Sequence, residues 1–208
     1  MADKLEQDIQ RFAKQTATLL NRKLPVAAGK MAKRHFQENF ERGGFVDGGL
    51  HPWTPAKRLS SSRGSTDDKR KTLMSSRNHL YSSINYTPGM AKVRIFNDVI
   101  YAPIHQNGGV LHPTVTPKMR RYAWSRYYSL AGANRSGSNG RKSGKKGKTV
   151  AGAVVESPEA QMWKRLALTK KTKLSITIPA RPFMGKSAEL DDKMVAYIEK
   201  EILRIINS

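Results

Sequence analysis

The chain has 208 residues, of which 38% are hydrophobic, so it is long enough for one sizeable domain or for a domain with a long insertion. It has no cysteine, which excludes disulfides, cysteine-based zinc sites and thiol catalysis. Its 38 Lys and Arg residues against 16 Asp and Glu give a net charge of +22, which predicts attraction to polyanions: nucleic acid, an anionic membrane surface or acidic proteins.

Two helices are predicted at the start of the chain. Pro25 suits the first turn of the second helix, which extends to Arg42 and ends at two glycines. We expect the two helices to form a hairpin whose apolar faces pack in the core. The first helix covers residues 4–23, with apolar-face positions at Leu5, Ile9, Phe12, Thr16, Leu19 and Leu20.

A long polar loop is predicted over residues 43–71, and its one large aromatic side chain is Trp53, held between two prolines. Such a residue either anchors the loop by packing or contacts a partner. A short helical segment then leads into a strand at about residues 82–87, followed by a turn at 87–89. Residues 91–98 alternate apolar and polar side chains, so we expect an antiparallel hairpin here.

Residues 111–173 are predicted to be a basic insertion within a single domain that spans residues 1–208. The stretch 111–150 contains ten Lys or Arg and no acid, and the Gly, Ser and Lys content of 132–149 predicts a flexible segment. Three roles stay open for the insertion: binding DNA through phosphate contacts and aromatic stacking, docking on acidic proteins, or a solvated loop. The residues expected to contact DNA or an acidic partner are Arg120, Arg121, Arg126, Arg141, Lys142, Lys145, Lys146 and Lys148.

The last third of the chain predicts a helix, a strand and a helix. Ser157 followed by Pro158 is typical of a helix start, and residues 173–179 alternate as a strand does. Ser187 is expected to cap a terminal helix with acidic residues in its first turn. The order of elements predicts an α+β fold with an N-terminal helical hairpin, a small, mainly antiparallel sheet, a C-terminal helix and the long basic insertion.

Residues 180–187, ARPFMGKS, fit a relaxed phosphate-loop pattern, but their chemistry argues against it. A phosphate loop works through converging backbone N–H groups, and Pro182 has none. Phe183 and Met184 are bulky where such loops favour small residues. Only 21 residues follow Ser187, which leaves no room for a later strand carrying an acidic magnesium ligand.

No other pattern predicts an enzyme. The five histidines do not have the spacing of metal ligands. Asp191 and Asp192 lie at the start of a predicted helix, where their charges stabilise the positive end of the helix dipole. We therefore expect no catalytic, cofactor or metal site. The charged N-terminus has no secretory character, and no apolar run approaches the roughly 20 residues of a membrane span, so the sequence predicts a soluble protein of a cytosol-like compartment.

Four sequence elements, taken in order, resemble a known family. They are Trp53-Thr54-Pro55, the pattern L-x-x-S-I at residues 80–84, YAPIHQNGG at 101–109, and IPARPFMG at 178–185. The order resembles the virion morphogenesis, or tail-completion, family of tailed bacteriophages, over about residues 1–110 and 174–208. The insertion is longer and more basic than the family pattern implies.

The resemblance implies a structural protein of the virion neck or tail, assembled as a ring, with six-fold symmetry favoured, where head and tail join. Its implied partners are copies of itself, neighbouring portal, connector, tail-tube or terminator proteins, and DNA passing through the neck, with no membrane partner. The alternative is a nucleic-acid-binding protein that acts through residues 118–148. The implied subunit or partner contacts are Trp53, Tyr101, His105, Gly108, Gly109, Arg181, Pro182 and Phe183. For Arg181 and Phe183 the alternative stays open that they lock and pack only the turn of their own subunit.

Overall fold

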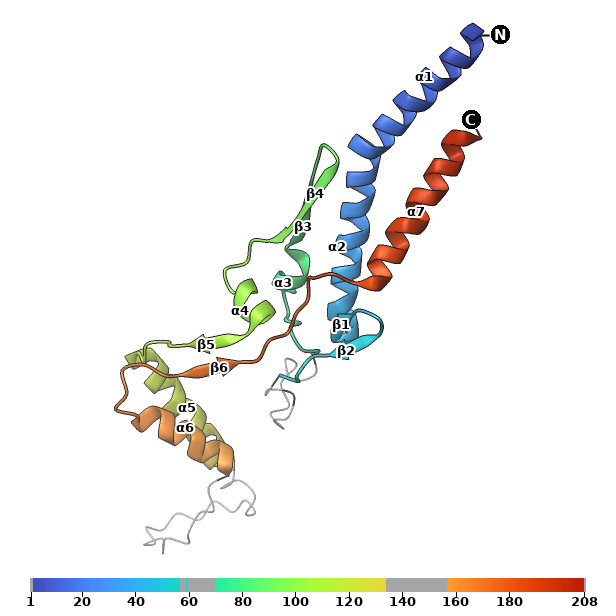
Figure 1. The fold of residues 1–208 in the computed structure, drawn as a ribbon. Coiled ribbons are helices and arrows are strands. Elements are labelled where there is room, and N and C mark those ends of the chain that lie inside the picture. Colours follow the sequence, from blue (N-terminus) through green and yellow to red (C-terminus); the bar gives the residue numbers. More distant parts are fainter. Residues whose placement is uncertain (1, 57–58, 60–69, 134–156, 208) are drawn as a thin grey trace, which may run out of the picture. The chain divides into compact units, whose positions relative to one another are not determined.

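The computed structural model describes residues 2–56, 59, 70–133 and 157–207 (Figure 1). The chain divides into two compact units. Unit 1 combines Met1–Gly109 with Ile178–Ser208, and unit 2 is Val110–Thr177. The mixture of helices and small antiparallel strand pairs confirms the predicted α+β class.

Unit 1 begins with one long helix, so the predicted helical hairpin is wrong. α1 (Ala2–Thr18) passes through a π-helical turn, η1 (Leu19–Lys23), into α2 (Leu24–Arg42) without a break (Figure 1). Thr18 and Lys23 both keep right-handed helical backbone angles. The physical reason lies in Pro25, which cannot complete the regular hydrogen-bond ladder. The wider π turn absorbs it, because Leu24 donates its N–H to the Leu19 carbonyl, five residues back.

The residues that follow α2 form a short strand pair inside the predicted loop. Gly43 ends the helix with a positive φ of 74°, and its N–H donates to the Asn39 carbonyl at 2.9 Å. β1 (Gly44–Val46) then pairs antiparallel with β2 (Leu50–Pro52), and Trp53 follows directly. Residues 57–58 and 60–69 of the predicted loop lie outside the described residues.

The predicted antiparallel hairpin in the middle of the chain is confirmed. After the short helix α3 (His79–Ser82), β3 (Ile84–Gly89) pairs with β4 (Lys92–Asn97), and both pack against α2. Its turn falls at residues 90–91, later than the predicted 87–89. Pro88 is tolerated inside β3 because a two-stranded pair has only edge strands, where a missing N–H can face away from the ladder.

Unit 1 is completed by α4 (Ala102–Asn107), which the sequence did not predict, and by α7 (Ala188–Ile206), which it did. Ser187 caps α7 by accepting a hydrogen bond from the Leu190 N–H, as expected. α7 packs against α2 and α1. The buried core joins these elements through Ala32, Phe36, Phe40, Trp53, Leu80, Ile84, Val99, Ala102, Phe183 and Leu190.

Unit 2 covers the predicted insertion. β5 (Gly109–Leu111) pairs with β6 (Ile176–Ile178), and between them lie two helices, α5 (Pro117–Ala133) and α6 (Pro158–Leu168), that pack against each other. Ser157 caps α6, as predicted, by accepting from the Ala160 N–H. Most of the predicted flexible segment, 132–149, lies outside the described residues. Within the residues described, no helix has both the length and the apolar character that crossing a bilayer requires.

Candidate functional site

The two sequence motifs of unit 1, residues 101–109 and 178–185, lie against each other. The N–H of Arg181 donates to the carbonyl of His105 at 2.8 Å. Gly108 has a φ of 71°, and a Cβ at this position would lie 2.7 Å from the backbone nitrogen of Ala180. Only glycine allows this backbone approach, so the contact between the two segments accounts for Gly108.

Gln106 fastens the second motif from the side. Its Oε1 accepts hydrogen bonds from the N–H groups of Phe183 at 2.9 Å and Met184 at 3.2 Å. Its Nε2 donates to the Met184 carbonyl at 2.6 Å. One amide side chain therefore satisfies three backbone groups of the turn, as a paired strand would.

The Trp53 loop is locked onto the same turn by two reciprocal hydrogen bonds. The indole Nε1 of Trp53 donates to the Pro182 carbonyl at 2.7 Å. In return, Nε of Arg181 donates to the Thr54 carbonyl at 2.8 Å. Arg181 is only 7% exposed, so a buried guanidinium holds this loop within its own chain.

Phe183 is the centre of the packing beneath the turn. It is fully buried, and its ring lies 5.2 Å from that of Phe40, centroid to centroid. The buried Asn39 amide donates to the Phe183 carbonyl and accepts from the Val46 N–H, both at 3.2 Å. Helix α2, strand β1 and the turn are thus joined at one point.

Gln106 and Asn39 were not predicted from the sequence. Gln106 lies inside the YAPIHQNGG motif, and no local pattern there indicates that its side chain binds a distant segment. Asn39 did give a signal, because it is a polar residue beside Phe36 and Phe40, the apolar face of its predicted helix. A polar residue on such a face needs an internal hydrogen-bond partner.

The remaining predicted contact residues of unit 1 lie at the edge of this arrangement. Pro182 and Gly109 are exposed, and Tyr101 is 45% exposed with its ring 5.8 Å from that of His105. The Tyr101 hydroxyl also lies 3.4 Å from Nδ1 of His79. A cavity of about 230 Å³ borders these side chains, lined among others by Thr72, Leu80, Tyr101, His105 and Arg181.

Four positions of the turn, residues 181–184, have no free amide to offer a phosphate. The N–H groups of Phe183 and Met184 donate to Gln106, the N–H of Arg181 donates to His105, and Pro182 has no N–H. These N–H groups are bonded within the chain, so they cannot converge on a phosphate as the amides of a phosphate loop do. In the part of the chain that the structure describes, no three acidic or histidine side chains are grouped to hold a metal ion.

The model of the phage virion morphogenesis family matches residues 2–203, nearly the whole chain, including both motifs and both units. The chain belongs to this family. No curated protein and no solved structure matches it significantly.

Membership in the phage virion morphogenesis family gives the chain a structural or assembly role in a virion, and the family is not one of enzymes. A structural or assembly role depends on the surfaces through which a protein binds other molecules. Two surfaces of this family member stand out, one in each unit.

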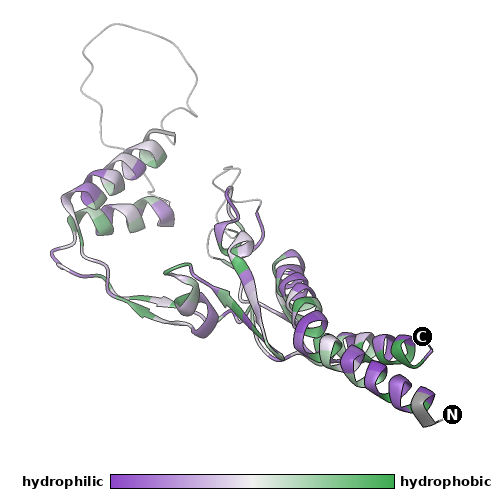
Figure 2. Cartoon of the chain, turned by 90° about the horizontal axis from the view of Figure 1, so that it is seen from above, coloured by the Kyte–Doolittle hydropathy of each residue, from purple (hydrophilic) through white to green (hydrophobic). Residues whose placement is uncertain are grey.

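The first is an exposed apolar face on the long helix of unit 1. Leu5, Ile9 and Phe12, spaced on one side of α1, are 64%, 59% and 44% exposed. The prediction that they pack in the core is therefore wrong, because only Leu19, near the end of the predicted stripe, is buried. Hydrophobic stretches, green in Figure 2, alternate with hydrophilic ones along the helices that carry the two chain ends. Ile202, Leu203 and Ile206 of α7 are exposed as well.

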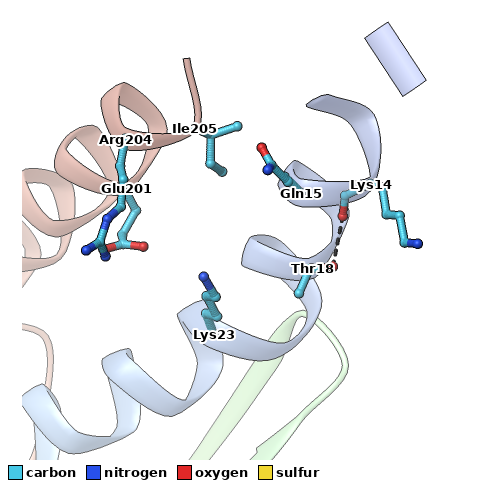
Figure 3. A pocket seen from close by; sticks show the side chains of 7 residues that line it. All are labelled: Lys14, Gln15, Thr18, Lys23, Glu201, Arg204 and Ile205. Atoms are coloured by element: carbon cyan, nitrogen blue, oxygen red, sulfur yellow. Dashed lines mark hydrogen bonds and ion pairs between the residues drawn. The ribbon is translucent and has the colours of Figure 1, made fainter. Parts of the chain in front are cut away.

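A hollow of about 390 Å³ separates α1 and η1 from α7 near these ends (Figure 3). Lys14, Gln15, Thr18 and Lys23 line it from one side, and Glu201, Arg204 and Ile205 from the other. Six of its seven lining residues are polar or charged, and Nη1 of Arg204 lies 3.5 Å from a carboxylate oxygen of Glu201. Because Leu5, Ile9 and Phe12 stay exposed, α7 does not cover the apolar face of α1.

The second surface is basic and belongs to unit 2. Arg120, Arg121 and Arg126, predicted to contact DNA or an acidic partner, lie on helix α5. The other five predicted residues, Arg141, Lys142, Lys145, Lys146 and Lys148, lie outside the described residues.

Two histidines of unit 1 make its stability depend on pH. Burial lowers the pKa of His35, and the charge of Lys193 lowers it further. Burial also lowers the pKa of His105, with a second contribution from Arg181. Within the described residues, neither Nε2 of His35 nor Nδ1 of His105 has a hydrogen-bond partner. The fold therefore favours both imidazoles in the neutral form.

We expect the free energy of unfolding to fall as the pH drops below about 6.5, the ordinary pKa of histidine. Below that pH the unfolded chain binds protons that the folded chain resists, and above it the stabilisation is complete. Urea unfolding between pH 7.5 and pH 5 measures the slope. The variant His35→Leu/His105→Leu should reduce the slope of unfolding free energy against pH. The control His112→Leu, at an exposed residue of unit 2, should keep the slope of the wild type. Equal slopes in the wild type and both variants would contradict the role of His35 and His105.

Proposed function

We propose that this chain is a structural virion protein that forms a homo-oligomeric ring at the junction of head and tail, with six-fold symmetry favoured. In that role it completes the tail or joins it to the head, next to portal or connector proteins on one side and tail-tube or terminator proteins on the other. Membership in the virion morphogenesis family supports the assembly role. The resemblance of the two motifs to the tail-completion pattern supports the location.

The observation that carries the ring is the exposed apolar face of α1. Three large apolar side chains in a row along one helix face would be covered in a monomer that functions alone. The same long helix extends them away from the core at Phe40 and Phe183, where a neighbouring subunit can reach them. A ring is built from head-to-tail contacts, so each subunit offers this face to a different surface of the next.

The turn of the second motif, residues 180–185 (the motif turn), is held rigidly within its own chain. Trp53, Arg181 and Phe183 are buried and held by hydrogen bonds and packing within the chain. In the proposed ring they fix the shape of the turn, and the exposed residues Tyr101 and Pro182 make the contact with a neighbour. The strong internal hydrogen bonds keep this contact surface in one conformation before assembly.

Single-cysteine photocrosslinking tests the ring, because the natural chain has no cysteine. The variant Ile9→Cys, labelled with benzophenone maleimide, should crosslink to further copies of the chain on irradiation. The matched control is Ile100→Cys, at a residue that is 98% exposed but lies outside α1, and it should crosslink far less. Mass measurement by light scattering and electron microscopy of purified neck complexes then give the number of subunits.

Neck complexes without a ring, or equal crosslinking of both variants, would overturn the proposal. A chain that stays monomeric in all of these experiments and binds DNA would favour the alternative, a nucleic-acid-binding protein acting through residues 118–148. The net charge of +22 is the observation behind that alternative.

A further inference from the structure

We propose that one end of the helical pair in unit 2 binds the phosphate backbone of duplex DNA. This end, the hairpin base, consists of residues 114–121 and 165–173. The inference goes beyond the assembly role, and it concerns residues of unit 2 alone.

The two helices of unit 2 run antiparallel, which brings both segments of the hairpin base together. An antiparallel bridge joins Thr114 to Lys173, and the N–H of Val115 donates to the Thr172 carbonyl at 2.8 Å. α5 leaves this bridge and α6 returns to it, so the first turn of α5 lies beside the last turn of α6. The contact between the rings of Tyr122 and Trp163, whose centroids are 5.7 Å apart, continues the same alignment.

Basic side chains are concentrated at this end, without acids to balance them. The hairpin base contains seven Lys and Arg residues, of which six are exposed and one, Arg120, is partly buried. The one acid among the described residues of unit 2, Glu159, lies in the first turn of α6, at the opposite end of the pair. Within the described part of the chain, none of the seven forms an ion pair. They are Lys118, Arg120, Arg121, Arg165, Lys170, Lys171 and Lys173.

The position of three of these cations is unfavourable for the helix itself. Lys118, Arg120 and Arg121 lie at the N-terminus of α5, where the helix dipole is positive and where a cation costs about 0.3–1 kcal/mol. No acidic residue occupies the first turn of α5. An anion bound here would be attracted by the side chains and by the helix N-terminus together, so the arrangement is suited to an anionic partner.

The structure favours phosphates over bases as the groups that are bound. Trp124 stacks on Tyr128 with 5.6 Å between ring centroids, and Tyr127 packs against both. These rings contact one another, whereas the cations of the hairpin base have no partner of opposite charge among the described residues. Unpaired cations gathered at one end are the pattern of backbone binding to duplex DNA, whereas single-strand binders depend on stacking platforms. Tyr122 and Tyr128 are 56% and 64% exposed, so the comparison with a single strand is part of the test.

The test compares two variants of the full chain that carry the same net charge. The hairpin variant is Lys118→Gln/Arg121→Gln/Arg165→Gln/Lys171→Gln. The control removes four exposed lysines from unit 1: Lys30→Gln/Lys92→Gln/Lys186→Gln/Lys200→Gln. Binding to a fluorescein-labelled 30-base-pair duplex of random sequence is measured by anisotropy over a series of salt concentrations, and circular dichroism checks that both variants keep their helices.

We expect the hairpin variant to lose at least about tenfold in affinity, and the magnitude of its slope of log K against log salt to fall by about 3, because each lost phosphate contact removes about 0.9. The control should keep the wild-type slope within about 1. In the wild-type chain, bound duplex should also protect Lys118, Lys170 and Lys171 from acetylation more than Lys30 and Lys92. The acetylation measurement uses only the wild-type chain, so it tests the proposal even if the hairpin variant does not fold.

Equal losses in both variants, or no selective protection, would overturn the proposal. So would poly-L-glutamate competing as well as duplex of equal charge, which would identify acidic protein as the partner, or tighter binding to a single strand of the same length. The ring is measured by mass, crosslinking and microscopy, and DNA binding by anisotropy. The two proposals can therefore fail separately.

Discussion

Phe183→Ala is expected to lower the free energy of unfolding by about 3–5 kcal/mol, the range for deleting a fully buried aromatic side chain. Phe183 has no exposed surface and packs on Phe40, which itself packs on Trp53 with 5.4 Å between ring centroids. The cavity left behind would be surrounded by helix α2, the Trp53 loop and α7. Helix α2 and the Trp53 loop cannot collapse into it freely, because both are held by hydrogen bonds to the turn.

The matched control is Phe12→Ala, the same substitution on the exposed face of α1. Because Phe12 is 44% exposed and Ala favours helix, we expect a loss below about 1 kcal/mol in the monomer. Urea unfolding followed by circular dichroism measures both variants. Similar losses in the two would show that Phe183 does not hold the core together. In the ring assay the order should reverse, with Phe12→Ala the more damaging substitution to assembly among folded proteins.

Gln106→Leu is expected to lower the free energy of unfolding by about 3–4 kcal/mol. It leaves two backbone N–H groups and one carbonyl of the turn without their partner, and each unsatisfied group costs about 1–3 kcal/mol when buried. The expected loss lies at the lower end of the summed cost of these three groups, because Gln106 is partly buried and water can reach some of them. Leu has nearly the same size, so the loss measures the hydrogen bonds rather than a cavity.

Two further variants separate the causes. Gln106→Glu keeps the two acceptor bonds but turns a carboxylate oxygen toward the Met184 carbonyl, so its loss should fall below that of Gln106→Leu only at a pH that protonates the carboxyl and lets it donate. Gln7→Leu, on the exposed surface of α1, controls for the added apolar side chain and should be nearly neutral. Hydrogen exchange gives a local measurement: the amides of Phe183 and Met184 should exchange much faster in Gln106→Leu. Unchanged exchange at both amides would refute the assigned role.

Local signals in the sequence predicted several elements correctly. The alternation around Val93 and Ile95 predicted the β3–β4 hairpin, and Ser187 predicted the start of α7. The apolar face of α2 at Phe36 and Phe40 lies in the core, as the periodicity implied. These signals succeed because a pattern of period two or 3.6, or a capping residue, acts within a few residues.

The errors have a different physical origin. Pro25 signals a helix start, and only the structure shows that a π turn lets the helix continue through it. Helix α5 was missed because aromatic and basic residues alternate along it without a clear apolar stripe. The contacts of Gln106 and Asn39 join residues 77 and 144 positions apart, and no local pattern records such pairs. For the same reason the sequence located the motif turn and did not show how it is held.

The close approach of Gly108 to Ala180 has a consequence for how this protein can evolve. The chain leaves unit 1 and re-enters it at adjacent points, and the strands β5 and β6 pair directly beyond them. A segment closed off in this way can be lengthened or replaced at a cost that grows only slowly with its length. By this argument, changes in the length of the segment between Gly108 and Ala180 should cost unit 1 little stability.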